Sequence, residues 1–166
     1  MALTVETGEL IDGANSYISL DDAISFVSSR GYTSILTDGL LLRAMDVIES
    51  LSFLGERVST AQSLQFPRRG IVCNGAELAS DVIPAQLKAA QCWMAHYIAQ
   101  GKDPSAARDK TVRRERVDAL EVEYDTTQGL NNSPNITDLP LVNNAIKCLL
   151  SCNNTTCNPV RFISRA

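Results

Sequence analysis

Between Pro84 and Gly101 the chain carries apolar side chains around most of the circumference of an expected helix. The apolar positions are Leu87, Ala89, Ala90, Cys92, Trp93, Met94, Tyr97, Ile98 and Ala99. A helix with so little polar surface is normally covered by other elements on several sides. Pro84 is tolerated in a first turn, and glycine commonly follows a helix end. We therefore expect this helix at the centre of the core.

Two shorter amphipathic segments precede it. The first follows Ser19, a typical helix-capping residue with Asp22 three positions on, and Gly31 ends it. Its expected buried face consists of Leu20, Ala23, Ile24 and Val27. The second runs from Asp38, the expected cap, to about Leu51 before Gly55. Its apolar residues at helical spacing are Leu41, Ala44, Met45, Ile48 and Leu51.

Residues 52–80 lack a helical pattern. Phe66 stands before Pro67 and is therefore biased out of the helical region. Arg68 and Arg69 follow on this expected extended loop. Arginine is favoured at protein interfaces and in carboxylate or phosphate contacts, so the pair is a candidate contact site. Two solvated charges on a surface loop explain the pair equally well.

Residues 112–124 change to the two-residue period of a strand. With a turn at Asp118-Ala119, Arg116 faces Glu121 and Arg114 faces Glu123, which would place opposite charges on one side of a hairpin. The same register pairs Glu115 with Val122, Arg113 with Tyr124 and Val117 with Leu120. We expect a protruding hairpin, although the turn lacks the asparagine–glycine or aspartate–glycine pair that favours one most strongly.

The remaining chain is expected to hold a polar loop from Gln128 to Pro140, a short helix over Leu141–Leu150 and a polar tail over Ser151–Ala166. We predict a mainly α fold, a small bundle of three to four helices with a hairpin and extended loops and termini. The expected divisions are an N-terminal arm (1–18), a helical core with the hairpin (19–127), and a C-terminal loop, helix and tail (128–166).

Composition excludes some functions. The formal net charge is −4, which disfavours a protein held to nucleic acid mainly by phosphate neutralisation. Residues 102–116 are locally basic, with six lysines or arginines against three acids. They could form a nucleic-acid patch, but a hairpin whose arginines face glutamates is favoured.

No run of about 18 apolar residues suggests a membrane span, and the N-terminus lacks a signal-peptide pattern. We expect a protein made and kept in the cytoplasm.

The cysteines number five: Cys73, Cys92, Cys148, Cys152 and Cys157. An odd, scattered set is a poor disulfide framework, so reduced thiols are expected. Zinc at the last three would need a fourth ligand, and no CxxC pair exists. His96, in the middle of the central helix, is expected to pack rather than catalyse. The common phosphate-, dinucleotide- and hydrolase motifs are missing from the sequence. We therefore expect neither enzymatic activity nor a metal or cofactor.

Several short stretches together resemble a known family. They are Asn15-Ser16-Tyr17 before the first helix, Gln62-Ser63-Leu64-Gln65-Phe66-Pro67-Arg68, Ile83-Pro84, and Val117–Tyr124, with Asp118 where glycine is more usual. Their order over residues 10–125 resembles small tailed-bacteriophage proteins often labelled DnaT-like single-stranded DNA-binding proteins. It is also similar to head–tail connector adaptors of the phage neck.

The adaptor resemblance implies a virion protein made in the bacterial host. Such adaptors form a homo-oligomeric ring, commonly of about twelve copies, which joins the portal to the tail or to a stopper or terminator protein. An acidic wall would let DNA pass without specific binding. The expected interface residues are Arg68, Arg69, Arg113, Arg114, Arg116, Arg161, Phe162 and Arg165. The label itself implies the alternative, a replication accessory that binds single-stranded DNA.

Overall fold

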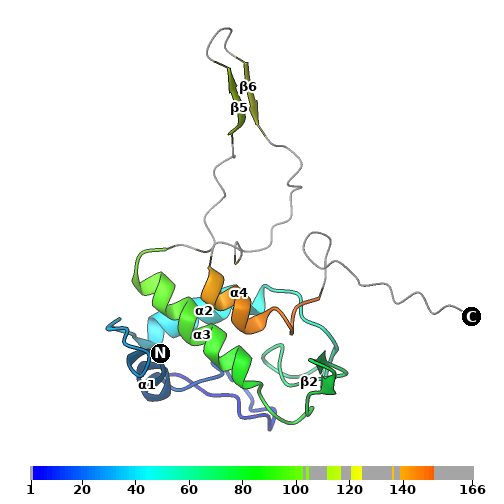
Figure 1. Ribbon diagram of the computed structural model, residues 1–166. Helices are drawn as coiled ribbons and strands as arrows, with labels where there is room; N and C mark the ends of the chain where they lie inside the picture. The colour runs from blue at the N-terminus through cyan, green and yellow to red at the C-terminus, as the bar shows by residue number, and fades with distance from the viewer. Residues whose placement is uncertain are drawn as a thin grey trace, which may run out of the picture.

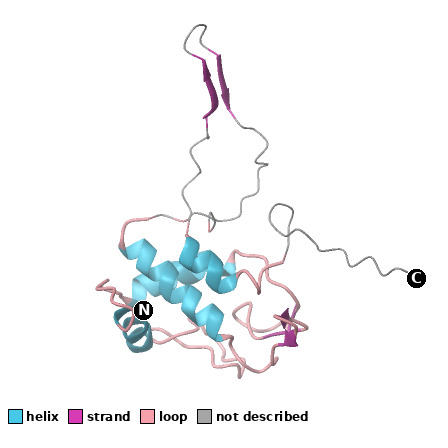
Figure 2. Cartoon of the chain, in the orientation of Figure 1, coloured by secondary structure: helices cyan, strands magenta, loops and turns pink. Residues whose placement is uncertain are grey.

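In the described part of the computed structural model, four helices pack together and short strands lie at the edge of the molecule (Figures 1 and 2). The structure describes residues 2–102, 104, 112–116, 121–124, 136 and 139–151. The helices are α1 (Leu20–Ser28), α2 (Asp38–Glu49), α3 (Ala85–Ala99) and α4 (Pro140–Ile146). The prediction of a small, mainly helical bundle with a hairpin is confirmed.

The described strands form three antiparallel pairs. The pairs are β1 (Glu56–Arg57) with β2 (Arg68–Arg69), β3 (Val72–Cys73) with β4 (Ala76–Glu77), and β5 (Val112–Arg116) with β6 (Glu121–Tyr124). The first two pairs lie in the segment 52–80, which was expected to be extended. None of the described helices has the length and apolar character that a membrane crossing requires.

α3 is the centre of the core, as its sequence predicted. It packs against α1, α2 and α4, and every side chain from Ala90 to Ile98 is buried. The helix begins at Ala85, with Pro84 as its N-cap residue, and ends before Gly101. Its apolar circumference is therefore covered on several sides at once.

The first two helices follow their predicted patterns with two corrections. Ser19 caps α1 by accepting a hydrogen bond from the Asp22 amide. Ile24, expected on the buried face, is instead 41% exposed, since α1 contacts the body through Ala23 and Val27. The cap of α2 is Thr37 and not Asp38, because the Thr37 hydroxyl accepts from the Leu40 amide. Asp38 then becomes the first helical residue, where its charge suits the helix dipole.

The hairpin register is confirmed at three of the expected pairs and wrong at one. Arg114 faces Glu123, Glu115 faces Val122 and Arg116 faces Glu121. Tyr124 faces Val112 rather than Arg113, because an irregularity between Val112 and Arg114 inserts one extra residue. The expected turn and the Val117–Leu120 pair lie outside the described residues.

The C-terminal helix is shorter than predicted, because α4 ends at Ile146. Its continuation still belongs to the core: Leu149 is buried, and Leu150 forms a bridge with Phe53. The segment expected as an N-terminal arm lies against the body, where Ser16 and Tyr17 are fully buried. The expected polar loop lies outside the described residues except at Ile136, Leu139 and Pro140, as does the tail beyond Ser151.

The expectation of reduced thiols is wrong for two cysteines. Cys73 in β3 and Cys148 after α4 form a disulfide, with their Cα atoms 5.7 Å apart. They are 75 residues apart in sequence, and the pairing of residues 149–151, after α4, with residues 52–54 brings them together. Cys92 is a buried free thiol, and its burial raises its pKa to about 12, which makes it a poor nucleophile.

Candidate functional site

Arg68 is not the exposed side chain that its place on a loop suggested. Its guanidinium donates to the backbone carbonyls of Leu54 at 2.7 Å, Gly55 at 2.6 Å and Phe53 at 3.3 Å. It also donates to the Gln65 side chain at 3.2 Å. The planar arrangement of five N–H donors suits this role, which lysine could not fill. Arg68 therefore fixes the 53–55 turn from inside the loop.

Arg69 points the other way. Its side chain is 64% exposed and forms a 3.4 Å ion pair with Glu56, which is 77% exposed. A pair so open to solvent contributes little to folding stability. Of the two adjacent arginines, Arg69 is thus the one whose charge is available to a partner.

A buried polar cluster connects two of the family-like stretches, Asn15–Tyr17 and Gln62–Arg68. The Tyr17 hydroxyl donates to Glu49 at 2.6 Å and accepts from the Phe66 amide at 3.1 Å. The other carboxylate oxygen of Glu49 accepts from the Gln65 amide at 2.8 Å. Burial, and then the neighbouring Glu49 charge, raise the pKa of Tyr17; burial raises the pKa of Glu49, against the two hydrogen bonds. The cluster holds the loop before Pro67 against α2.

On α3, Gln91 is a second buried polar residue that holds an irregular segment against a helix. Its side-chain oxygen accepts from the Tyr17 amide at 3.0 Å, and its nitrogen donates to the Ser16 hydroxyl at 2.8 Å. A fully buried amide on a mostly apolar helix must be satisfied in this way. Sequence reasoning missed Gln91, Glu49 and Glu6, although a polar residue within an apolar helical stretch was a visible signal for Gln91.

Glu6 organises the loop that follows it. Its carboxylate is 1% exposed and accepts from the amides of Gly8 at 2.8 Å, Leu10 at 3.1 Å and Ile11 at 2.9 Å. Leu10 has a φ of 61°, a left-handed conformation that a leucine rarely adopts, and its side chain is 38% exposed. The three hydrogen bonds from backbone amides to Glu6 thus keep Leu10 at the surface in a strained backbone conformation.

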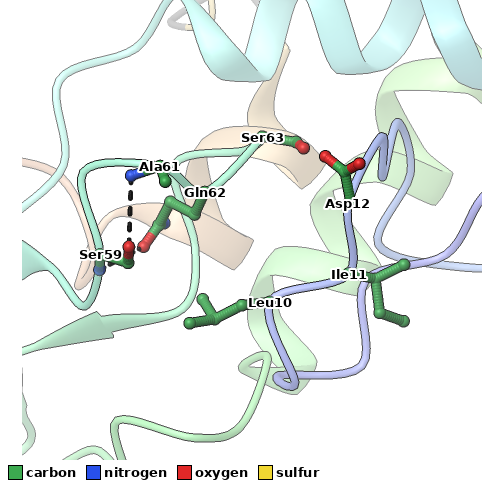
Figure 3. Close-up of a pocket in the computed structure, with 7 residues that line it drawn as sticks. All are labelled: Leu10, Ile11, Asp12, Ser59, Ala61, Gln62 and Ser63. Carbon is green, nitrogen blue, oxygen red and sulfur yellow. Dashed lines mark hydrogen bonds between the residues drawn. The ribbon is translucent and has the colours of Figure 1, made fainter.

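Beside Leu10 lies an open hollow of about 230 Å³ (Figure 3). One wall is the loop Leu10, Ile11 and Asp12; the other is the loop Ser59, Ala61, Gln62 and Ser63. The Gly13 amide donates to the Ser63 hydroxyl at 3.0 Å and ties the walls together. Drug-sized ligands usually occupy pockets of about 300–1,000 Å³, so this hollow is small for one.

An aromatic cluster lies at the C-terminal end of α1. The Tyr32 ring packs edge-to-face on Trp93 and on His96, with centroids 5.3 and 4.7 Å apart. The Arg30 guanidinium lies 3.5 Å from the centroid of the Phe26 ring. His96 is buried as predicted and hydrogen-bonds the Ser34 hydroxyl at 2.6 Å. Among the described residues, no carboxylate hydrogen-bonds the imidazole in the way that the third group of a hydrolase triad does.

The structure does not show contacts between the remaining predicted contact residues and these sites. For Arg113, Arg114 and Arg116 the structure gives the strand register alone. Arg161, Phe162 and Arg165 lie outside the described residues. Within the part of the chain that is described, no group of three or more His, Cys, Asp or Glu side chains is placed to hold a metal ion.

Comparison with known protein families identifies a relationship. A family model described as "Putative DnaT-like ssDNA binding protein" matches residues 1–163. No curated protein and no solved structure matches the chain. Because the family model spans almost the whole sequence, the chain belongs to the DnaT-like family that this description names.

Proposed function

We propose that the protein is a structural head–tail adaptor of a tailed bacteriophage, which works in the phage neck by assembling with copies of itself and with the portal. The observation that carries this proposal is the β5–β6 pair. No described helix packs extensively against either strand, and Figure 1 draws the pair away from the helical body. An isolated two-stranded hairpin is marginally stable in water, so a strand pair of this kind gains from a neighbouring surface.

Charge supports the same proposal. The net charge of −4 suits a protein that surrounds passing DNA without holding it. The sequence places Arg113, Arg114 and Arg116 in this hairpin as candidate charged contacts for a partner, and the exposed Arg69 is a further one. The partners in this proposal are further copies in a ring, the portal, and a tail, stopper or terminator protein.

The test is the mass of the assembly with and without the purified portal, measured by native mass spectrometry. Replacing Arg113, Arg114 and Arg116 together with glutamate should reduce assembly, because each arginine would become a repulsive charge. Arg43→Glu, an exposed change on α2, is the matched control. A chain that stays monomeric alone and with the portal would refute the proposal.

A second candidate function is binding of single-stranded DNA, and the family description supports it more directly than the first. The positive charge that could attract DNA phosphates lies in the basic segment 102–116. Electrostatic capture predicts an affinity that falls steeply with salt. Fluorescence anisotropy with a labelled oligo(dT) at about 20 and 200 mM salt decides this candidate, since proteins with several phosphate contacts differ by orders of magnitude over that range. No binding at either concentration would eliminate it.

A further inference from the structure

The most exposed large apolar side chain in the described part of the chain is Ile35, at 84%. It lies in the loop between α1 and α2, where Tyr32 is also 38% exposed. Isolated exposed apolar residues need no explanation. Ile35, however, lies three residues after Tyr32, whose ring packs on Trp93 and His96 and anchors the loop.

The same loop begins with a cation that is held in place. Arg30 stacks over Phe26, and its Nη1 donates to the Phe26 carbonyl at 2.8 Å. Tyrosine, tryptophan and arginine are the residues most enriched among the energetic centres of protein interfaces. The α1–α2 loop therefore presents an apolar knob, Ile35, together with a positive charge.

The hollow beside Leu10 has a mixed apolar and polar lining that includes a carboxylate. Leu10 and Ile11 supply apolar wall, and Asp12 supplies an exposed carboxylate at the rim. Figure 3 draws these three residues on one loop and Ser59, Ala61, Gln62 and Ser63 on the other. Gln62 keeps its own loop folded by donating to the Leu64 carbonyl at 2.7 Å and accepting from the Ser59 amide at 3.0 Å. The hollow is thus preformed and of a size for one side chain.

Knob and hollow do not meet within one chain. Figure 1 draws the loop between α1 and α2 at the left of the body, and the segment before α1 runs beneath it toward the β1–β2 side. Ile35 remains 84% exposed accordingly. Because the two patches lie on different sides of one molecule, a contact between copies would pair them, and such a head-to-tail contact repeats to give a ring or a filament.

We propose that Ile35 of one copy inserts into the hollow between Leu10 and Ser63 of a second copy, with Arg30 facing Asp12 of that copy. The inference rests on the self-association in the proposed function and assigns its contact surface. The strained conformation of Leu10, maintained by Glu6, serves to shape the wall that receives the knob.

The first test is Ile35→Asp, measured by sedimentation of the full chain over a concentration series. Self-association should weaken about ten- to a hundredfold, since a buried branched aliphatic side chain is replaced by a charge. Val72→Asp is the matched control, because Val72 is 59% exposed but lies on β3, outside the α1–α2 loop and outside the lining of the hollow. An unchanged assembly in Ile35→Asp would overturn the contact and leave the adaptor proposal standing.

The second test is a charge exchange. Arg30→Glu should weaken association, and adding Asp12→Arg in the same chain should restore it, because the opposite pair is recreated between copies. Far-ultraviolet circular dichroism confirms that each variant is folded. Failure of the exchange to restore association would overturn the Arg30–Asp12 contact. A wild-type chain that is monomeric at every concentration would refute this contact, whereas assembly on the portal alone would preserve the adaptor function.

Discussion

The body around α3 and the segment 52–80 are both well packed, but different forces hold them. α3 is buried through apolar side chains that recur along one helix, so its position follows from local pattern and packing. The segment 52–80 has few regular hydrogen bonds and is held by side chains from elsewhere, namely Glu49, Tyr17 and Cys148, together with its own Arg68. The comparison teaches that an irregular segment can be as fixed as a helix when buried polar groups have definite partners.

The largest effect is expected in the helical body. Leu87→Ala should lower the free energy of unfolding by about 2–5 kcal/mol, because Leu87 is fully buried and its removal leaves a cavity in the core. Urea denaturation measures the change. Ile24→Ala, at a 41% exposed position on α1, is the control and should have a much smaller effect. Equal losses in the two variants would contradict the central place of α3.

Reduction of the Cys73–Cys148 disulfide should come next. A cross-link that closes a loop of this length restricts the unfolded chain and stabilises a fold by about 2–4 kcal/mol. Urea denaturation with and without dithiothreitol measures the loss. The Cys73→Ala/Cys148→Ala double variant should not respond to the reductant. If it responds as strongly as the wild type, the other cysteines are responsible.

The two adjacent arginines of the segment 52–80 should differ in their contribution to stability. Arg68→Ala should lower the free energy of unfolding by about 1.5–3 kcal/mol, because the carbonyls of Phe53, Leu54 and Gly55 lose a charged donor. Arg69→Ala should change stability by less than about 0.5 kcal/mol, since its ion pair is exposed. Similar values for the two variants, measured by urea denaturation, would show that Arg68 is not the anchor of the loop.

The smallest effect concerns pH. Burial raises the folded-state pKa of Glu49, so its contribution to stability is fully present below the ordinary carboxyl range and is lost as pH rises through the raised value. The free energy of unfolding of the wild type, relative to Glu49→Gln, should therefore fall with rising pH. A difference that is constant with pH would mean that the Tyr17 and Gln65 hydrogen bonds cancel the effect of burial.

Prediction from sequence succeeded where neighbouring residues decide the outcome. The span of α3, the Ser19 cap and three hairpin pairs depend on spacing within a few residues, and they were confirmed. The cap of α2 and the pairing of Tyr124 were wrong by one residue, because a competing threonine and a strand irregularity shift the boundary locally. Exposure of Ile24 could not be predicted, since it depends on how α1 is turned toward the body.

The sequence by itself determined the helical character of the body, the extended segment before α3 and the charge of the surface, because these follow from periodicity and composition. Only the tertiary structure decided that Arg68 faces inward and Arg69 outward, that Cys73 meets Cys148, and that Leu10 lines a hollow. The physical reason is that each of these depends on groups far apart in the chain, whose encounter is set by packing and not by spacing.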